Sequence, residues 1–365
     1  MEQVYYAGLD IHKKIIAFCI KQADGTIVAE GKIDASRAAL KQWAASTPGP
    51  WIGAMEATIF TGWVYDFLKS YARQLQVGNP LMMKAITAAK KKNDKLDART
   101  IADLVRCNLL PRCHMASEEM RDLRRVLRYR NLLVRQAVRM KNRMATLLME
   151  TGQEYNKKKL HGAKYFRGLL EKIQDVPESF KEILQMSRGA LELFESCQKR
   201  LLKGLVHNEG LQERVQRLMS IQGVGEVTAL SWALEIGDVQ RFTSIRKAIS
   251  YCGLCSSQVE SGGKITRMPL SKQRNKHLQS VLIEAAKLAP GHNPELAQVY
   301  NQERQRGNNH NQATITVARK LVAFLLAVDK SGKAFVKKAE KQAAYDTVTP
   351  MAIIPLVRAY LGTVL

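Results

Sequence analysis

A repeat of apolar residues within residues 117–150 constrains the fold more than any other feature of this sequence. Its side chains alternate between spacings of three and four, which places them along one face of a single long helix: Met120, Leu123, Leu127, Val134, Ala137, Met144 and Leu148. Arg130 and Lys141 interrupt the repeat. A second helix with this spacing is predicted from Leu184 to Leu205, so we expect a helical hairpin. Its apolar face then packs within one chain or pairs two protomers.

The residues before this arm alternate between short β-branched runs and amphipathic segments, a pattern typical of a mixed α/β domain. Strands are predicted at residues 4–9, 15–20, 26–33, 51–55 and 74–77, and helices at residues 38–43, 61–71 and 93–105. The predicted fold class is therefore α/β followed by α. Its regions are an α/β domain at 1–115, a helical coiled-coil arm at 116–210, a mainly helical domain at 211–330, and a tail at 331–365 of unassigned role.

The charge of the chain indicates a polyanionic partner. Lys and Arg number 57 against 33 Asp and Glu, which gives a formal net charge of +24. Such a charge favours nucleic acid first and an anionic membrane surface second, and it argues against a small-molecule metabolic enzyme. The longest apolar run, residues 321–328, is far shorter than the roughly 20 residues of a membrane span, so we expect no membrane partner. Six scattered cysteines suit a reducing cytoplasm.

Four acidic residues of the α/β domain are candidate metal ligands. Asp10 and Glu56 each end a predicted strand, and Asp94 and Asp97 lie about one turn apart at the start of a predicted helix. Carboxylates in this arrangement can hold two Mg²⁺ or Mn²⁺ ions, which stabilise the attacking and leaving oxygens in phosphoryl transfer. Each acid also has a structural alternative. Asp10 can cap a turn, and Asp94 can cap the helix with Asp97 in its first turn.

Basic residues beside these acids and along the long helix are candidate contacts for a nucleic-acid backbone. Between Met120 and Met144 the chain has nine Lys or Arg residues and a single acid, Asp122. The alternative interpretation is a solvated helix face. The candidate contacts are Lys90, Lys91, Lys92, Lys95, Arg124, Arg128, Arg135, Arg139, residues 157–159, Lys264 and Lys272.

Three segments of the first hundred residues resemble the DEDD motifs of the IS110-type (IS110/IS1111) insertion-sequence transposases, which are related to the pilin-gene invertase. They are Tyr6-Ala-Gly-Leu-Asp10-Ile-His-Lys, Met55-Glu56-Ala-Thr58 and Lys92-Asn-Asp94-Lys-Leu-Asp97-Ala-Arg99. The resemblance implies a RuvC-like, ribonuclease-H-type fold for the α/β domain, with Asp10, Glu56, Asp94 and Asp97 as catalytic metal ligands. It continues in order to about residue 328.

The resemblance also covers two segments of the C-terminal half. Ile221-Gln-Gly223-Val-Gly225 predicts a helix-hairpin-helix-like turn, whose backbone N–H groups can hold a phosphate, or else a simple connection between helices. In the family, a serine of the following transposase domain joins covalently to a DNA 5′ phosphate. Ser261 is the candidate because two glycines follow it and nearby amides can stabilise the attacked phosphate. A plain hairpin turn is the structural alternative, and Ser256, Ser257 and Ser271 are competing serines.

The activity implied by the resemblance is that of a DNA transposase or recombinase, which cuts and rejoins double-stranded donor and target DNA through a 5′-phosphoserine intermediate. Other implied properties are guidance by a structured non-coding (bridge) RNA and dimers that assemble into a tetramer. Two other function classes stay open. One is a RuvC-like structure-specific DNA endonuclease that uses metal-activated water, and the other is a nucleic-acid-binding protein without catalytic activity.

Overall fold

The computed structural model describes residues 3–86 and 93–336. The chain divides into two compact units, Met1–Arg121 and Asp122–Leu365, which we describe separately. The predicted Lys90, Lys91 and Lys92 contacts lie outside the described residues, as does most of the tail.

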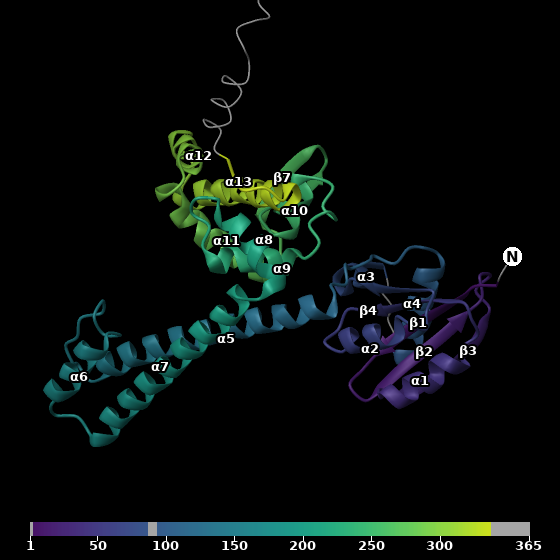
Figure 1. Ribbon diagram of the computed structural model, residues 1–365, viewed down its shortest axis with the longest axis horizontal. Helices are drawn as coiled ribbons and strands as arrows, with labels where there is room; N and C mark the ends of the chain where they lie inside the picture. The colour runs from purple at the N-terminus through teal and green to yellow at the C-terminus, as the bar shows by residue number, and fades with distance from the viewer. Residues whose placement is uncertain (1–2, 87–92, 337–365) are drawn as a thin grey trace, which may run out of the picture. The chain divides into compact units, whose positions relative to one another are not determined.

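The first unit is built on a mixed sheet (Figure 1). In the described residues its strand order is β3-β2-β1-β4-β5. Strands β1, β2 and β3 are antiparallel, whereas β4 and β5 run parallel to β1. The strand predictions are confirmed with small shifts of their ends. The observed bounds are β1 Tyr5–Ile11, β2 Ile15–Lys21, β3 Ile27–Asp34, β4 Trp51–Glu56 and β5 Gln74–Gly78.

Helices cover both faces of this sheet. The odd-numbered residues of β1, such as Leu9, pack with Leu40 of α1 and Val64 of α2. The opposite face of β1 carries Gly8 and is covered by α4, because successive residues of a strand point to opposite faces. The helices of this unit are α1 Arg37–Ser46, α2 Thr61–Leu68, α3 Pro80–Ile86 and α4 Asp94–Arg106. The sequence did not predict α3.

Helix α4 lies directly on the backbone of β1 at Gly8. A Cβ atom built on Gly8 would lie 2.1 Å from the carbonyl oxygen of Ala98 and 2.4 Å from the amide nitrogen of Ala102, so only glycine leaves room for the helix. Small residues of α4 and β2 pack around this contact: Ala98, Ala102, Ala17 and Cys19. The close approach brings the first turn of α4 toward the end of β1, where Asp10 is located.

The second unit contains the predicted helical hairpin. Helix α5 (Glu118–Glu150) packs antiparallel to α7 (Glu178–Val206), with α6 (Ala163–Lys172) at the far end (Figure 1). Met144 of α5 shares one apolar cluster with Leu184 and Leu191 of α7. An ion pair between Lys141 Nζ and Glu195 Oε1, 2.9 Å apart, crosses the same interface. Part of the apolar repeat is therefore core within one chain.

The rest of the second unit is mainly helical. Its helices are α8 Glu209–Met219, α9 Glu226–Ile236, α10 Ile245–Tyr251, α11 Lys276–Leu288, the 3₁₀ helix η1 Ala289–Gly291, α12 Pro294–Gln305 and α13 His310–Ser331. By length and composition alone α13 could cross a membrane. It packs against α8, α10, α11 and α12, and half of its apolar stretch is buried, including Val317, Leu321 and Leu325. Helix α13 is therefore the core helix of this unit.

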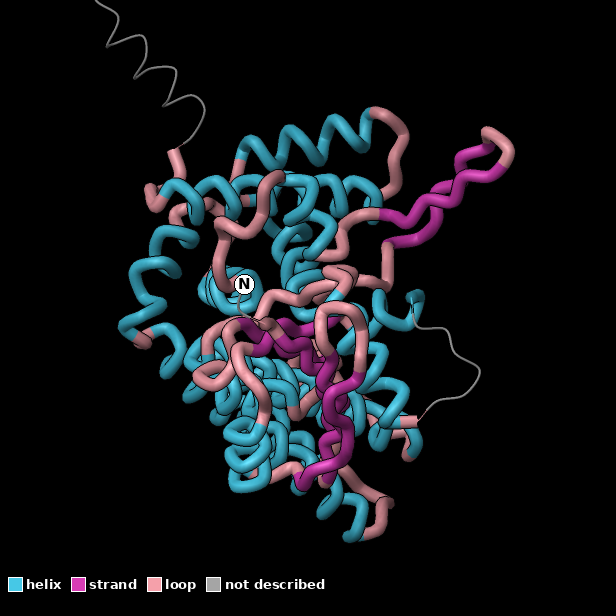
Figure 2. The backbone as a smooth tube through the Cα atoms, turned by 90° about the vertical axis from the view of Figure 1, so that its right-hand side faces the viewer, coloured by secondary structure: helices cyan, strands magenta, loops and turns pink. Residues whose placement is uncertain are grey.

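Glycines at positive φ form two turns of this unit that the sequence singled out. The predicted connection between helices is confirmed, because α8 and α9 are joined through Gly223, which has φ +92° and lies against Ala289. The second of these turns lies in the basic segment at 261–276. It contributes to a hairpin of β6 (Ser256–Ser261) and β7 (Lys264–Leu270), shown in Figure 2. Gly262 and Gly263, both at positive φ, allow the two-residue turn, so the hairpin alternative is confirmed.

We predict that Gly8→Ala destabilises the first unit by about 1–3 kcal/mol, because the added methyl group collides with the α4 backbone. Urea unfolding followed by tryptophan fluorescence measures this, since Trp43, Trp51 and Trp63 lie in the first unit. The matched control is Gly62→Ala in α2, where the added Cβ would lie 3.4 Å from Arg121 Nε. This control is expected to leave stability unchanged or raise it by a few tenths of a kcal/mol. Equal stability of both variants would contradict the packing argument.

Candidate active site

The sheet places Asp10 and Glu56 at one edge. Strands β1 and β4 are parallel neighbours in which Leu9 pairs with Met55, so the next residue of each strand is an acid. Residues in register on neighbouring strands point to the same face, here the face covered by α4. Asp10 is 8% exposed, and burial is the main reason that its pKa is raised.

Helix α4 brings Asp94 and Asp97 to the same edge. The helix begins here because the side chain of Asn93 caps it, with Oδ1 accepting a hydrogen bond of 2.8 Å from the Leu96 amide. Burial is the largest cause of the raised pKa of Asp10, and the negative charges of Asp97 and Asp94 raise it further. Carboxylates from β1 and from α4, two elements that are distant in the sequence, therefore repel one another at one edge of the sheet.

Glu56 joins this group through a small cavity. The cavity has a volume of about 60 Å³, and its lining includes Glu56, Asp97, Lys84 and Thr100. A water molecule takes up about 30 Å³ in the liquid, so the cavity has room for roughly two occupants of that size. The structure thus places the four predicted acids at one edge of the sheet: Asp10 and Asp94 approach each other closely, and Glu56 and Asp97 line the small cavity.

Two residues at this edge were missed by the sequence interpretation. His12 Nε2 lies 3.0 Å from Asp10 Oδ2 and 3.5 Å from Asp94 Oδ1. Lys32 Nζ donates a hydrogen bond of 2.7 Å to Asp94 Oδ2, and this bond is the main reason that the pKa of Asp94 is lowered. The spacing of two residues between Asp10 and His12 at a strand end was a usable signal, because i and i+2 share a face. Lys32 had no such signal.

The donor atoms at this edge suit a divalent cation. One oxygen of Asp10, one oxygen of Asp94 and one ring nitrogen of His12 all lie within 4.8 Å of one another. Carboxylate oxygens are the ligands that Mg²⁺ and Mn²⁺ prefer, and an imidazole is compatible with a transition metal. A cation here would also relieve the repulsion that raises the pKa of Asp10. The residues therefore fit the predicted metal.

The predicted serine lies in the second unit, at the end of β6. Ser261 is exposed and pairs with Lys264 across the hairpin turn. Among the described residues its hydroxyl has no hydrogen-bond partner, whereas Ser257 Oγ donates to the Pro269 carbonyl at 3.5 Å and Ser271 Oγ accepts from the Gln273 amide at 3.1 Å. Ser261 is therefore a hydroxyl that is available to an external group.

Comparison with known proteins identifies the family. A model of the DEDD transposases of IS110 type, described as a transposase, matches residues 7–152, which contain the four acids. A model of the transposase IS116/IS110/IS902 family matches residues 215–301, which contain Ser261. The chain belongs to the IS110 family of transposases. The two halves of the resemblance seen in the sequence are thus confirmed in their order.

Named relatives agree with this assignment. The chain is 26% identical to a transposase for insertion sequence element IS1328 of Yersinia enterocolitica over 92% of this chain and 100% of the relative. It is 25% identical to the transposase for IS1111A of Coxiella burnetii, over 79% of this chain and 78% of the relative. A pilin gene-inverting protein of Moraxella bovis is 28% identical over 35% of this chain and 40% of its own.

Two of the basic residues predicted to contact nucleic acid make internal contacts in this transposase. Arg128 donates two hydrogen bonds, of 2.8 and 2.7 Å, to the carboxylate of Glu235, which is 1% exposed. Arg124 Nε donates to the carbonyl oxygen of Leu234 at the end of α9. Both arginines thus hold α5 against α9, and a contact of these two residues with nucleic acid stays a prediction.

Apart from residues 157–159, the other predicted basic contacts in the described parts of the chain fall into two groups. Lys95 pairs with Glu30, together with Arg99, and the hydrogen bonds from Arg99 and Lys95 lower the pKa of Glu30 to about 2. The second group is exposed on the second unit and has no ion pair within the described parts of the chain: Arg135, Arg139, Lys264 and Lys272. That these four residues contact nucleic acid stays a prediction.

We predict that Glu235→Gln removes a pH-dependent part of the stability of the second unit. Burial raises the pKa of Glu235, but hydrogen bonds from Arg128 and Asn275 outweigh burial and hold it below its ordinary value of 4.5. The charged pair therefore stabilises the fold fully above pH 4.5, and this stabilisation is lost as the pH falls through the lowered pKa. At pH 7 we expect Glu235→Gln to lower the Tm, with a smaller difference from wild type at pH 3.

Thermal unfolding followed by circular dichroism between pH 3 and 7 tests this prediction. The matched control is Glu213→Gln, since Glu213 is 87% exposed and pairs with Arg217 on the surface of α8. Exposed pairs contribute about 0–1 kcal/mol, so this control should follow wild type at every pH. A Glu235→Gln curve parallel to wild type across the whole range would overturn the assignment.

Proposed function

We propose that this transposase cuts and rejoins donor and target DNA by combining metal-ligating carboxylates with a nucleophilic serine. The observation that carries the proposal is the convergence of Asp10, Glu56, Asp94 and Asp97 at one edge of the sheet, on elements that are distant in the sequence. Asp10 and Glu56 lie at adjacent parallel strand ends with α4 across them, an arrangement in which carboxylates can hold metal ions for phosphoryl transfer.

The first unit is proposed to have a RuvC-like, ribonuclease-H-type fold. Three antiparallel strands continued by two parallel ones, in the order β3-β2-β1-β4-β5, support this proposal. Divalent metal bound here would stabilise the charge that develops on the attacking and leaving oxygens. Asp10, Glu56, Asp94 and Asp97 are its proposed ligands. Lys32 and His12 hold Asp94 and Asp10 in place by direct contacts.

Ser261 is the proposed nucleophile. Its Oγ attacks the scissile phosphorus, a bond forms between serine and the 5′ phosphate, and the bond from phosphorus to the 3′ oxygen breaks. The proton lost by the serine ends on that 3′ oxygen, which leaves as a hydroxyl. The reverse reaction with another strand's 3′ hydroxyl rejoins the DNA without ATP, because the phosphodiester energy is kept in the serine ester. The exposure of Ser261 at a glycine turn supports this role.

The proposal extends to partners. A structured non-coding (bridge) RNA guides the choice of donor and target DNA, and dimers assemble into a tetramer so that several active sites can exchange strands. The net charge of +24 and the exposed basic residues Arg135, Arg139, Lys264 and Lys272 support binding of nucleic acid. We place this activity in the cytoplasm, on bacterial DNA.

We predict that Asp10→Asn weakens the binding of Mn²⁺ at least tenfold, because one charged oxygen ligand is replaced by a neutral amide. Isothermal titration calorimetry of the DNA-free protein measures the affinity directly. The control is Asp24→Asn, an exposed acid of the same unit that accepts hydrogen bonds from Thr26. Asp24→Asn should bind the metal as wild type does. If Asp10→Asn bound Mn²⁺ with unchanged affinity, the metal would not bind at this edge.

We predict that wild type forms a covalent adduct with DNA that Ser261→Ala and Asp97→Asn both fail to form. The assay incubates protein, the element's RNA, donor and target DNA and Mg²⁺, followed by denaturing gel electrophoresis. Ser256→Ala, Ser257→Ala and Ser271→Ala are the controls and should retain the adduct. An adduct that persists in Ser261→Ala and disappears in one control would move the nucleophile to that serine. Nicked DNA without any adduct would favour a structure-specific endonuclease that uses metal-activated water.

A further inference from the structure

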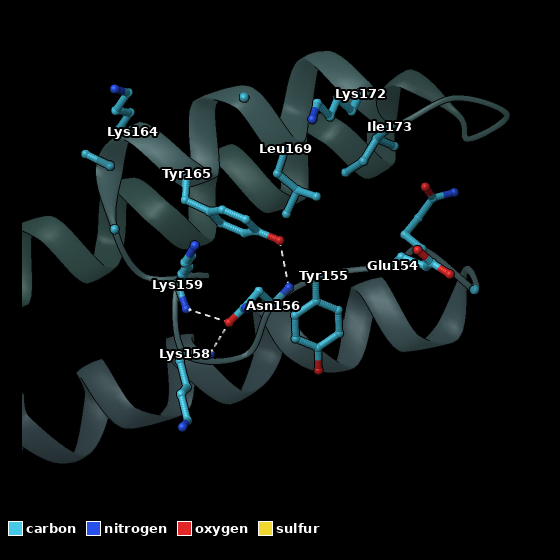
Figure 3. Close-up of a pocket in the computed structure, with 15 residues that line it drawn as sticks. Glu154, Tyr155, Asn156, Lys158, Lys159, Lys164, Tyr165, Leu169, Lys172 and Ile173 are labelled. Atoms are coloured by element: carbon cyan, nitrogen blue, oxygen red, sulfur yellow. Dashed lines mark hydrogen bonds between the residues drawn. The ribbon is translucent and has the colours of Figure 1, made fainter.

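The far end of the helical arm contains a large, open cavity. Residues 152–173 lead from α5 through a loop into α6, and they enclose a volume of about 1270 Å³ (Figure 3). This exceeds the usual 300–1,000 Å³ of a small-molecule pocket, which suits a segment of a polymer. None of the residues proposed above for metal binding or for nucleophilic attack belongs to it.

The cavity is strongly basic. Its lining contains one acid, Glu154, and four lysines: Lys158, Lys159, Lys164 and Lys172. All four lysines are exposed, and among the described residues none of their ammonium groups has a carboxylate partner. Elsewhere on the arm Lys141 and Arg188 are neutralised by Glu195 and Glu192. The end of the arm therefore concentrates positive charge that the fold itself does not use.

Two aromatic rings accompany the lysines. Tyr155 and Tyr165 both line the cavity and are half-buried. The hydroxyl of Tyr165 accepts a hydrogen bond of 2.6 Å from the Asn156 amide, which holds this ring in one orientation (Figure 3). Asn156 Oδ1 accepts from the amides of Lys158 and Lys159 at 3.0 and 3.2 Å, so the same residue orders the loop that carries two of the lysines.

We propose that this cavity binds an unpaired segment of nucleic acid, with phosphates at the lysines and a base stacked on a tyrosine ring. Aromatic rings stack on bases only where the bases are free of a duplex, and lysines neutralise the backbone without regard to sequence. A duplex would leave the tyrosines unused, because its base faces are already stacked. The segment belongs to an RNA or to a DNA strand, which share this chemistry. The site is independent of the catalytic proposal and stands if that proposal fails.

Photocrosslinking of the full chain locates the bound segment. The probes are 12-nucleotide single strands of RNA and of DNA that carry 5-iodouracil, together with a matched duplex. We expect a crosslink at Tyr155 or Tyr165 with the single strands and none there with the duplex. Comparison of the crosslink yields of the RNA and DNA probes at equal concentration identifies whether the bound segment is RNA or DNA. Crosslinks confined to other parts of the chain would overturn the proposal.

Charge variants test the same site by affinity. Lys164→Gln combined with Lys172→Gln should lower the crosslink yield at the tyrosines. The double variant should also reduce the slope of log Kd against log salt concentration for single-strand binding by about 1.4, because each lost phosphate contact removes about 0.7 from this slope. The matched control is Lys199→Gln combined with Lys203→Gln, two exposed lysines of α7. If both double variants changed the salt dependence equally, the effect would come from net charge alone and the proposed site would be overturned. Circular dichroism confirms that all variants are folded.

Discussion

The carboxylate cluster depends on one close backbone contact, that of α4 with β1 at Gly8. Any larger residue at this position would push the helix away from the strand, because its Cβ would overlap the Ala98 carbonyl. The same contact determines how far along β1 the first turn of α4 lies, and therefore how close this turn comes to the edge of the sheet. Asp94 and Asp97 therefore reach Asp10 as a consequence of packing, and the energy that gathers these like charges comes from the apolar contacts of Ile101, Leu104 and Val105.

Charge is distributed differently in the two units. In the first unit, acids are brought together with only partial compensation from His12 and Lys32, which leaves a site that favours a cation. In the second unit the buried carboxylate of Glu235 is fully paired, by Arg128 and Asn275, and the result is a structural connection between α5, α9 and the start of α11. Uncompensated charge marks the proposed sites, whereas compensated charge holds helices together.

Particular residues show which parts of the fold and of the candidate site the sequence patterns could predict. The predictions for β1, β4 and α4 succeeded because their apolar periods are regular, and the four acids could be recognised as strand ends and a helix start. The contacts of Arg124 and Arg128 with α9 could not be predicted, because a basic helix face looks the same whether it meets solvent or a buried glutamate 107 residues away. The sequence indicated a hairpin turn at Ser261 but not the extent of β6 and β7, because these strands lie on an exposed hairpin and lack a buried face to produce alternation.

The sequence by itself determined the order of elements, the family motifs and the identity of the candidate acids, because these depend on local periodicity and on residue type. Only the tertiary structure decided which side chains meet. The roles of His12, Lys32 and Glu235 arise from contacts between segments far apart in the chain. Local patterns cannot encode such contacts, since the distance between two segments is determined by how the elements between them pack.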